Sequence, residues 1–101
     1  MIHRFLPEAR DELYEAALYY EFKERGLGVR FRHEVARVVE RIIEDPLLWR
    51  ERPGRYRRVN CPVFPHYVTY FIRGETIVIA AIAHGHRRPE YWIKRKLSSG
   101  Q

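Results

Sequence analysis

The sequence predicts an α+β domain in which a short N-terminal strand and a helical hairpin pack on a small antiparallel β-sheet, in the order β-α-α-β-β-β. Two stretches of helical apolar periodicity occupy the first half of the chain. Short stretches rich in β-branched and aromatic residues occupy the second half. The 101 residues suffice for one domain with one modest core, so we expect a single domain over residues 1–101.

The helical hairpin is predicted from two matching apolar patterns. Residues 2–6 are expected to form the short strand, and Pro7 suits the first turn of a helix. Apolar residues then recur at i, i+4, i+7, i+8 and i+11 on both sides of Gly26-Leu27-Gly28, which permits a tight turn. Asp45-Pro46 ends the second helix. The expected core positions are Ala9, Leu13, Ala16, Ala17 and Tyr20, and then Phe31, Val35, Val38, Val39 and Ile42.

The first helix carries a second apolar stripe formed by Tyr14, Leu18 and Phe22. These residues are four apart and lie roughly opposite the first apolar face. A helix with two apolar faces is either sandwiched in the core or exposes one face to a partner. We expect the helix to be sandwiched between the second helix and the sheet, with a partner-binding face as the alternative.

The second half is predicted to form the sheet. A loop with Trp49, Pro53 and Gly54 covers residues 47–54. The segment 76–83 is apolar on both faces and should be a central strand. Residues 90–97 form either a short helix or an extended tail. The expected strands are 55–61, 66–73 and 76–83, with a hairpin turn at Arg73-Gly74-Glu75.

Charge is distributed unevenly along the chain. The net charge is +6, yet residues 1–50 hold 9 Lys/Arg and 10 Asp/Glu, whereas residues 51–101 hold 10 Lys/Arg and 3 Asp/Glu. A one-sided basic field is typical of proteins that bind nucleic acid or an acidic protein. Cys61 is the only cysteine, so no intrachain disulfide is possible, and no His/Cys cluster has the spacing of a zinc site. We expect no cofactor. With no signal peptide and no membrane span, we expect a cytoplasmic protein.

The segment HGHRRPEYW, residues 84–92, is the strongest functional pattern. His84 or His86 could act as general acid or base, because imidazole titrates near neutral pH. Arginines here and in the strand 55–61 could clamp phosphate, and Tyr91 could stack on a base or donate a proton. The candidates are Arg57, Arg58, His84, His86, Arg87, Arg88 and Tyr91.

Each candidate also has a structural interpretation. One of the two histidines could bond a backbone carbonyl where the strand ends. Neighbouring strand residues such as Arg57 and Arg58 point to opposite faces, so one of them at most faces a given site. Tyr91-Trp92, like Trp49 and Tyr67, could belong to the core.

These segments together resemble the RelE/ParE superfamily of toxins from type II toxin–antitoxin systems, and most of all its ParE-like, plasmid-stabilisation branch. The resemblance covers nearly the whole chain and depends on the order and spacing of its parts. The segments that carry it are EARDELYEAALYYEFKERGLGVRF (Glu8–Phe31), DPLLW (Asp45–Trp49), GRYRRV (Gly54–Val59), FPHYVTYF (Phe64–Phe71) and HGHRRPEYW.

The resemblance implies growth inhibition, by one of two mechanisms. RelE-like members enter the ribosomal A site and cut mRNA without a metal, whereas ParE-like members poison DNA gyrase and cut nothing themselves. A degenerate toxin that only binds its antitoxin is the third possibility. We expect Arg58, His84, His86, Arg87, Arg88 and Tyr91 to gather at one end of the sheet as the toxic surface. A cognate antitoxin is expected to fold onto Tyr14, Leu18 and Phe22.

Overall fold

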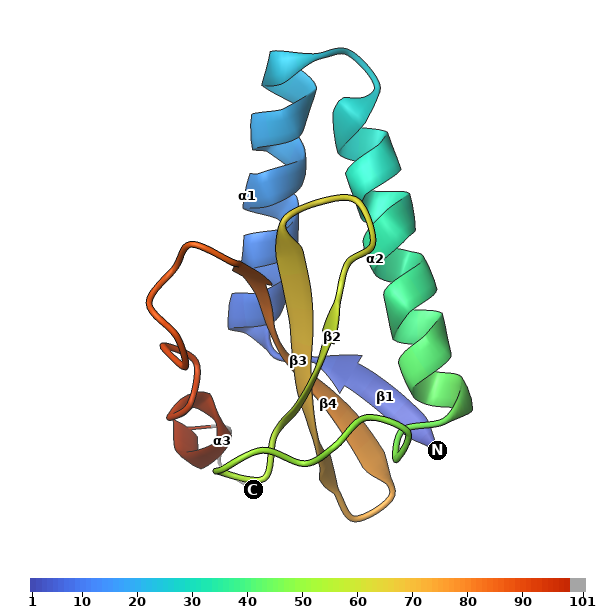
Figure 1. Cartoon of the computed structure of the whole chain (residues 1–101), viewed down its shortest axis with the longest axis vertical. Coiled ribbons are helices and arrows are strands. Elements are labelled where there is room, and N and C mark those ends of the chain that lie inside the picture. Colours follow the sequence, from blue (N-terminus) through green and yellow to red (C-terminus); the bar gives the residue numbers. More distant parts are fainter. Residues whose placement is uncertain (99–101) are drawn as a thin grey trace.

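The computed structural model describes residues 1–98 and has the predicted α+β fold (Figure 1). The element order matches the prediction, and a short C-terminal helix follows. The elements are β1 (Ile2–Phe5), α1 (Pro7–Lys23), α2 (Leu27–Glu44), β2 (Arg57–Asn60), β3 (His66–Arg73), β4 (Thr76–His84) and α3 (Arg95–Ser98).

The sheet has four strands in the order β1-β4-β3-β2. β3 pairs antiparallel with both β2 and β4, and β4 lies between two strands, as its apolar sequence predicted. β1 pairs parallel to β4, with Ile2 opposite Thr76, so the sheet is mixed. β1 pairs with β4 only as far as Ile79, and the remaining length of β4 extends beyond the end of β1.

The turn between α1 and α2 depends on two glycines. Gly26 has a φ of 86°, a conformation that side chains other than glycine rarely adopt. A Cβ added at Gly28 would lie 2.3 Å from the carbonyl oxygen of Ala17, so glycine is required for the close approach of the two helices. The carboxylate of Glu21 accepts hydrogen bonds from the backbone N–H groups of Gly26 and Gly28 and fixes the turn.

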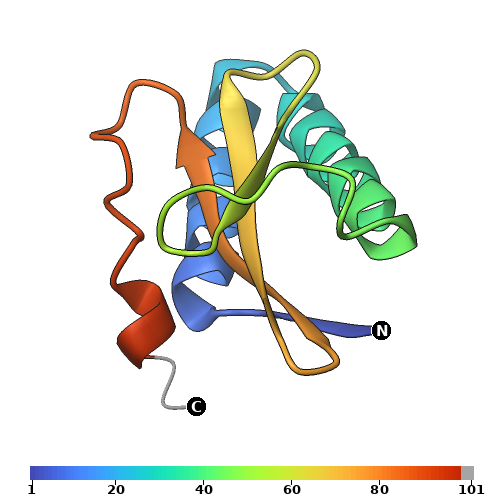
Figure 2. The same ribbon diagram turned by 60° about the horizontal axis from the view of Figure 1, so that its bottom comes forward.

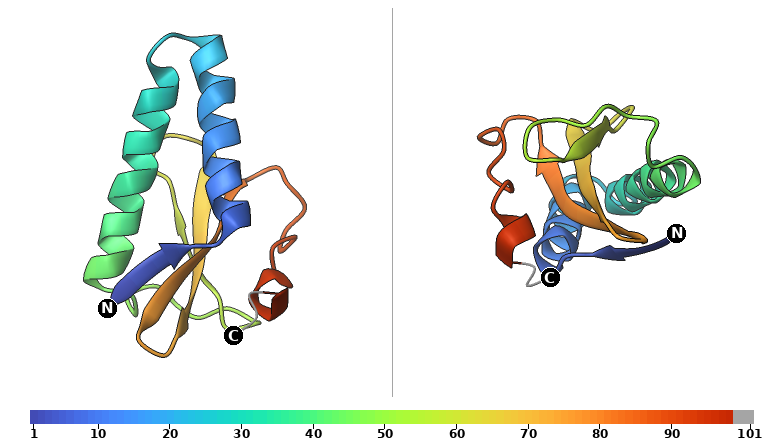
Figure 3. Two further views of the ribbon diagram at one scale, coloured as in Figure 1. Left: turned by 180° about the vertical axis from the view of Figure 1, so that it is seen from behind. Right: turned by 90° about the horizontal axis from the view of Figure 1, so that it is seen from below.

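Each face of the sheet has its own apolar cluster. α1 and α2 lie side by side, and they cover one face (Figure 3), which we call the helix face. The other, outer face buries Tyr67, Phe71 and Trp92. Trp92 belongs to the C-terminal segment (residues 85–98), which descends beside the sheet on the side away from α2 (Figure 2). The structural interpretation of Trp92 and Tyr67 as core residues is therefore confirmed.

The prediction that α1 is sandwiched in the core is wrong. Tyr14, Leu18 and Phe22 are 56%, 60% and 89% exposed. α2 packs beside α1 and not over it, so the sheet side of α1 is buried at Ala9 and Ala17 while the far side faces solvent. The apolar stripe is therefore an uncovered surface of the described part of the chain.

Candidate functional site

Three imidazole rings form a row at the end of β4. His66 lies opposite His84 in the β3–β4 pairing, and their ring centroids are 5.0 Å apart. The ring of His86 lies 4.9 Å from that of His84. The Nδ1 atom of His84 accepts a hydrogen bond from the backbone N–H of His86 at 2.9 Å, which leaves the proton of neutral His84 on Nε2. His84 thus bonds a backbone amide and not the carbonyl that we expected.

His66 is the buried end of this row. Its ring packs edge-on against Tyr20 and Phe31 on the helix face, and its Nδ1 atom has no hydrogen-bond partner among residues 1–98. Burial, and secondarily the neighbouring His84, lowers the pKa of His66 to about 4. His66 is therefore a neutral core residue at physiological pH.

Arg58 lies on the opposite face of the sheet from His84. Its guanidinium stacks 3.8 Å from the ring centroid of Tyr67, which belongs to the outer-face cluster. His84 neighbours His66, whose ring packs on the helix face. Arg57 points away from Arg58 and donates a hydrogen bond to the carbonyl of Trp49 at 2.5 Å. The structure therefore does not bring Arg58 and His84 to a common reacting atom.

Arg87 and Tyr91 are brought together in the C-terminal segment. The Arg87 guanidinium lies 3.9 Å from the Tyr91 ring centroid. The Tyr91 hydroxyl donates a 2.6 Å hydrogen bond to Glu12 on α1, and burial together with that bond raises the pKa of Tyr91 well above its usual value. A hydroxyl in this state is a poor proton donor. Arg88 and His86 are exposed, so residues 86–88 form a cationic loop facing solvent.

Glu12 fixes the C-terminal segment at an irregularity in β4. Thr69 pairs with Ala81 and Tyr70 pairs with Ile79, so β4 contains one extra residue at this point. The Glu12 carboxylate accepts a hydrogen bond from the backbone N–H of Ile82, which lies beyond the last β1 pair. Arg95 pairs with Glu12 at 2.9 Å and also donates to the carbonyl of Ala80. The two side chains thus satisfy backbone groups that no strand pairs.

Neither a nucleophilic cysteine nor a metal-ligating cluster is found among the described residues. Cys61 is buried, and burial raises the pKa of its thiol to about 12, so it is not a ready nucleophile. Within residues 1–98, no three His, Cys, Asp or Glu side chains are grouped so that they could hold a metal ion. In the same range, no helix is both long and apolar enough to cross a membrane.

Comparison with known proteins decides the family. The family model described as the ParE toxin of the type II toxin–antitoxin system parDE matches residues 4–89. The chain belongs to the ParE toxin family. A solved structure of the chromosomal ParDE toxin–antitoxin system from P. aeruginosa has the same fold, with a TM-score of 0.72 and 17% identity, over 83% of this chain and 95% of that chain. A comparison with curated protein sequences gave no significant match.

The roles of Glu12 and Arg95 in this ParE-family toxin were not predicted from the sequence. A signal was present for Glu12, because it lies three residues after Ala9 and four before Ala16, on the apolar face of α1. An acidic residue on a core-facing position requires a buried partner. No local pattern indicates that this partner is Arg95, which lies 83 residues away.

Proposed function

We propose that this ParE-family toxin arrests growth by binding DNA gyrase and does not cleave RNA. The observation that carries the proposal is the hydrogen bond from the Tyr91 hydroxyl to Glu12. This hydrogen bond occupies the hydroxyl of Tyr91, the candidate proton donor, and it holds the C-terminal segment against the sheet.

Metal-independent RNA cleavage needs a base, an acid and cations that converge on one phosphate. Here the candidate groups diverge: Arg58 stacks on the outer face, whereas His84 lies beside His66 on the helix face. Arg87 stacks on Tyr91, whose own proton is held by Glu12. This arrangement favours a toxin that acts by binding over one that acts by proton transfer.

The exposed loop of residues 86–88 is the proposed contact with gyrase. It presents His86, Arg87 and Arg88 to solvent beside Pro89. Exposed arginines next to an aromatic ring are common anchors in protein interfaces. The toxic surface is therefore smaller than the predicted one: it keeps His86, Arg87 and Arg88, and it leaves Arg58 and His84 outside.

The exposed stripe on α1 is the proposed binding site for the cognate ParD-type antitoxin. The ParDE system of P. aeruginosa pairs a toxin of this fold with an antitoxin. The stripe is an exposed apolar surface whose three residues, Tyr14, Leu18 and Phe22, follow one another at intervals of about one helical turn. Such a surface suits an amphipathic segment that folds on binding.

The test is to induce the chain without an antitoxin and to pulse-label DNA and protein synthesis separately. We expect DNA synthesis to fall and the DNA-damage response to rise before protein synthesis declines. An early loss of protein synthesis with cleaved mRNA would support the endoribonuclease instead. Normal growth at high expression of folded protein would support the degenerate toxin.

A further inference from the structure

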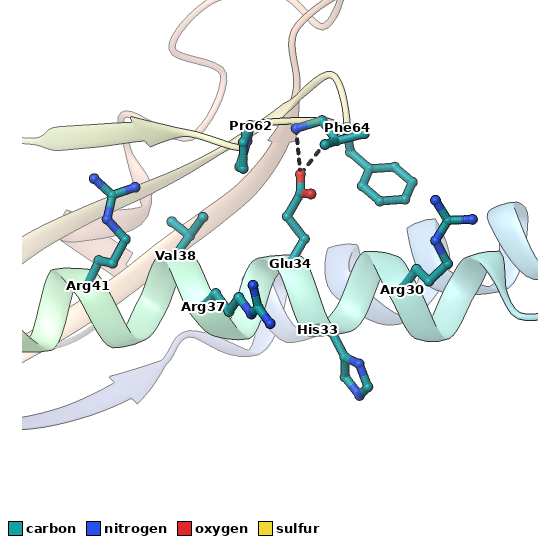
Figure 4. Close-up of a pocket in the computed structure, with 9 residues that line it drawn as sticks. Arg30, His33, Glu34, Arg37, Val38, Arg41, Pro62 and Phe64 are labelled. Carbon is teal, nitrogen blue, oxygen red and sulfur yellow. Dashed lines mark hydrogen bonds between the residues drawn. The ribbon is translucent and has the colours of Figure 1, made fainter.

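A cationic groove lies between α2 and the loop that joins β2 to β3 (Figure 4). Its volume is about 360 Å³, which accommodates one or two side chains of a partner. None of the residues in the predicted toxic surface or in the α1 stripe lines it. The groove is therefore a separate surface.

Three arginines line the α2 side of the groove. Arg30, Arg37 and Arg41 are at i, i+7 and i+11, so they follow one face of the helix over about 16 Å. All three are exposed, and Arg30 and Arg37 make no hydrogen bond or ion pair within residues 1–98. Arg41 lies 5.4 Å from the ring centroid of Trp49, which holds it at the end of the groove.

The one carboxylate that lines the groove already accepts hydrogen bonds from the neighbouring loop. Glu34 projects from α2 between Arg30 and Arg37, and its Oε2 atom accepts hydrogen bonds from the backbone N–H groups of Val63 and Phe64, at 3.0 and 2.9 Å (Figure 4). Glu34 thus holds the loop in place and forms the groove wall. Three cations against one engaged carboxylate give the groove a positive charge.

Apolar side chains complete the groove. Val38 and Phe64 are buried in the core, whereas Val63 on the loop is 75% exposed. A large exposed aliphatic side chain among cations can contact an apolar group of a partner and keep water from it. The groove therefore combines an apolar contact with flanking positive charges.

We propose that this groove binds an acidic protein segment that inserts a bulky apolar side chain beside Val63 and places carboxylates against Arg30 and Arg37. Charge complementarity steers such a segment to the groove, and the apolar contact slows its release. Nucleic acid fits less well, because bases stack on exposed aromatic faces, whereas the ring of Phe64 is buried and the exposed apolar side chain is the aliphatic Val63. The proposal does not depend on the target of the toxin.

The test uses a fluorescein-labelled 14-residue peptide of Glu and Asp with two Leu four positions apart, titrated with the full chain by fluorescence polarisation. We expect Arg30→Glu/Arg37→Glu to weaken binding at least tenfold, because two attractive charges become repulsive. Arg4→Glu/Arg10→Glu makes the same charge change on exposed residues outside the groove and should weaken binding less than threefold. Val63→Ser should weaken binding several-fold, and thermal melts should confirm that every variant folds.

Three outcomes would overturn the proposal. If both arginine double variants lost the same binding affinity for the peptide, the attraction would depend on net charge alone. If a peptide with both Leu replaced by Ser bound as tightly as the original peptide, no apolar side chain would enter the groove. Tighter binding of a 14-nucleotide oligo(U) than of the peptide, abolished by Arg30→Glu/Arg37→Glu, would make the groove a nucleic-acid site.

Discussion

The carboxylate of Glu12 on α1 and the guanidinium of Arg95 in α3 form an ion pair at 2.9 Å, with both side chains more than four-fifths buried. The pair joins the first helix to the C-terminal segment across the part of β4 that extends beyond β1. The Glu12 carboxylate also accepts hydrogen bonds from the Tyr91 hydroxyl and from the backbone N–H of Ile82. The position of the C-terminal segment, and so of the exposed cationic loop before it, depends on this pair.

Glu12→Gln should destabilise the fold by about 2 kcal/mol. The amide loses the charge that pairs with Arg95, and hydrogen bonds to charged groups contribute about 1.5–3 kcal/mol. Urea unfolding measures the change, with Glu15→Gln as a control on the exposed side of α1 that should stay within about 0.5 kcal/mol. Equal stability of the two variants would show that the ion pair does not hold the segment.

Stability should fall between pH 7 and pH 5 because of His66. Its pKa is about 4 in the folded chain and 6.5 when unfolded, so the unfolded state binds more protons in this window. The stabilisation is complete above pH 6.5 and is lost as the pH falls toward 4. Over pH 7 to 5 the loss is about 2 kcal/mol.

His66→Leu isolates this contribution, because leucine cannot titrate among Tyr20 and Phe31. Unfolding of both proteins at pH 7 and pH 5 provides the measurement. If the variant loses as much stability on acidification as the natural chain, His66 is not the titrating group.

Leu18→Asp should leave the toxin folded and weaken the antitoxin complex. Leu18 is 60% exposed, so the substitution should cost under about 1 kcal/mol of folding stability. Loss of a central apolar anchor should reduce affinity about thirtyfold or more. Calorimetric titration with the cognate antitoxin tests this, and Glu15→Ala is the neighbouring control. Unchanged affinity would place the antitoxin elsewhere.

The fold was largely predictable because its signals are local. The apolar spacing of α2 and the continuous apolar run of β4 identify their elements without tertiary information. The parallel pairing of β1 and the exposed stripe of α1 were not predictable in this way. Both depend on where an element docks, which local periodicity does not encode.

The candidate site was less predictable than the fold. We expected His84 and Arg58 at one end of the sheet, but β3 separates their strands, and the face of each side chain follows from the pairing register. The register contains an extra residue in β4 at Ala80–Ala81, a long-range feature without a local signal. Glu12 was visible as a charge on an apolar face, whereas its partner Arg95 was not.

His84→Ala/His86→Ala should retain toxicity, whereas Arg87→Glu/Arg88→Glu should abolish it. A binding toxin needs no proton transfer, but reversing two exposed charges should disrupt a docking loop. Growth arrest after induction measures both variants, with thermal melts to confirm folding. Loss of toxicity in a folded histidine variant alone would indicate acid–base chemistry, for which a loss of ~10²–10⁴ in rate is typical.

The most direct test of the proposed mechanism is to add the purified chain to two reconstituted systems. One contains DNA gyrase, ATP and relaxed plasmid, and the other contains ribosomes programmed with a defined mRNA. If the proposed mechanism is correct, the toxin blocks supercoiling or traps cleaved plasmid in the first system, the Arg87→Glu/Arg88→Glu variant does neither, and mRNA in the second system stays intact. Cleavage of mRNA on the ribosome, with supercoiling unaffected at the same toxin concentration, would contradict it.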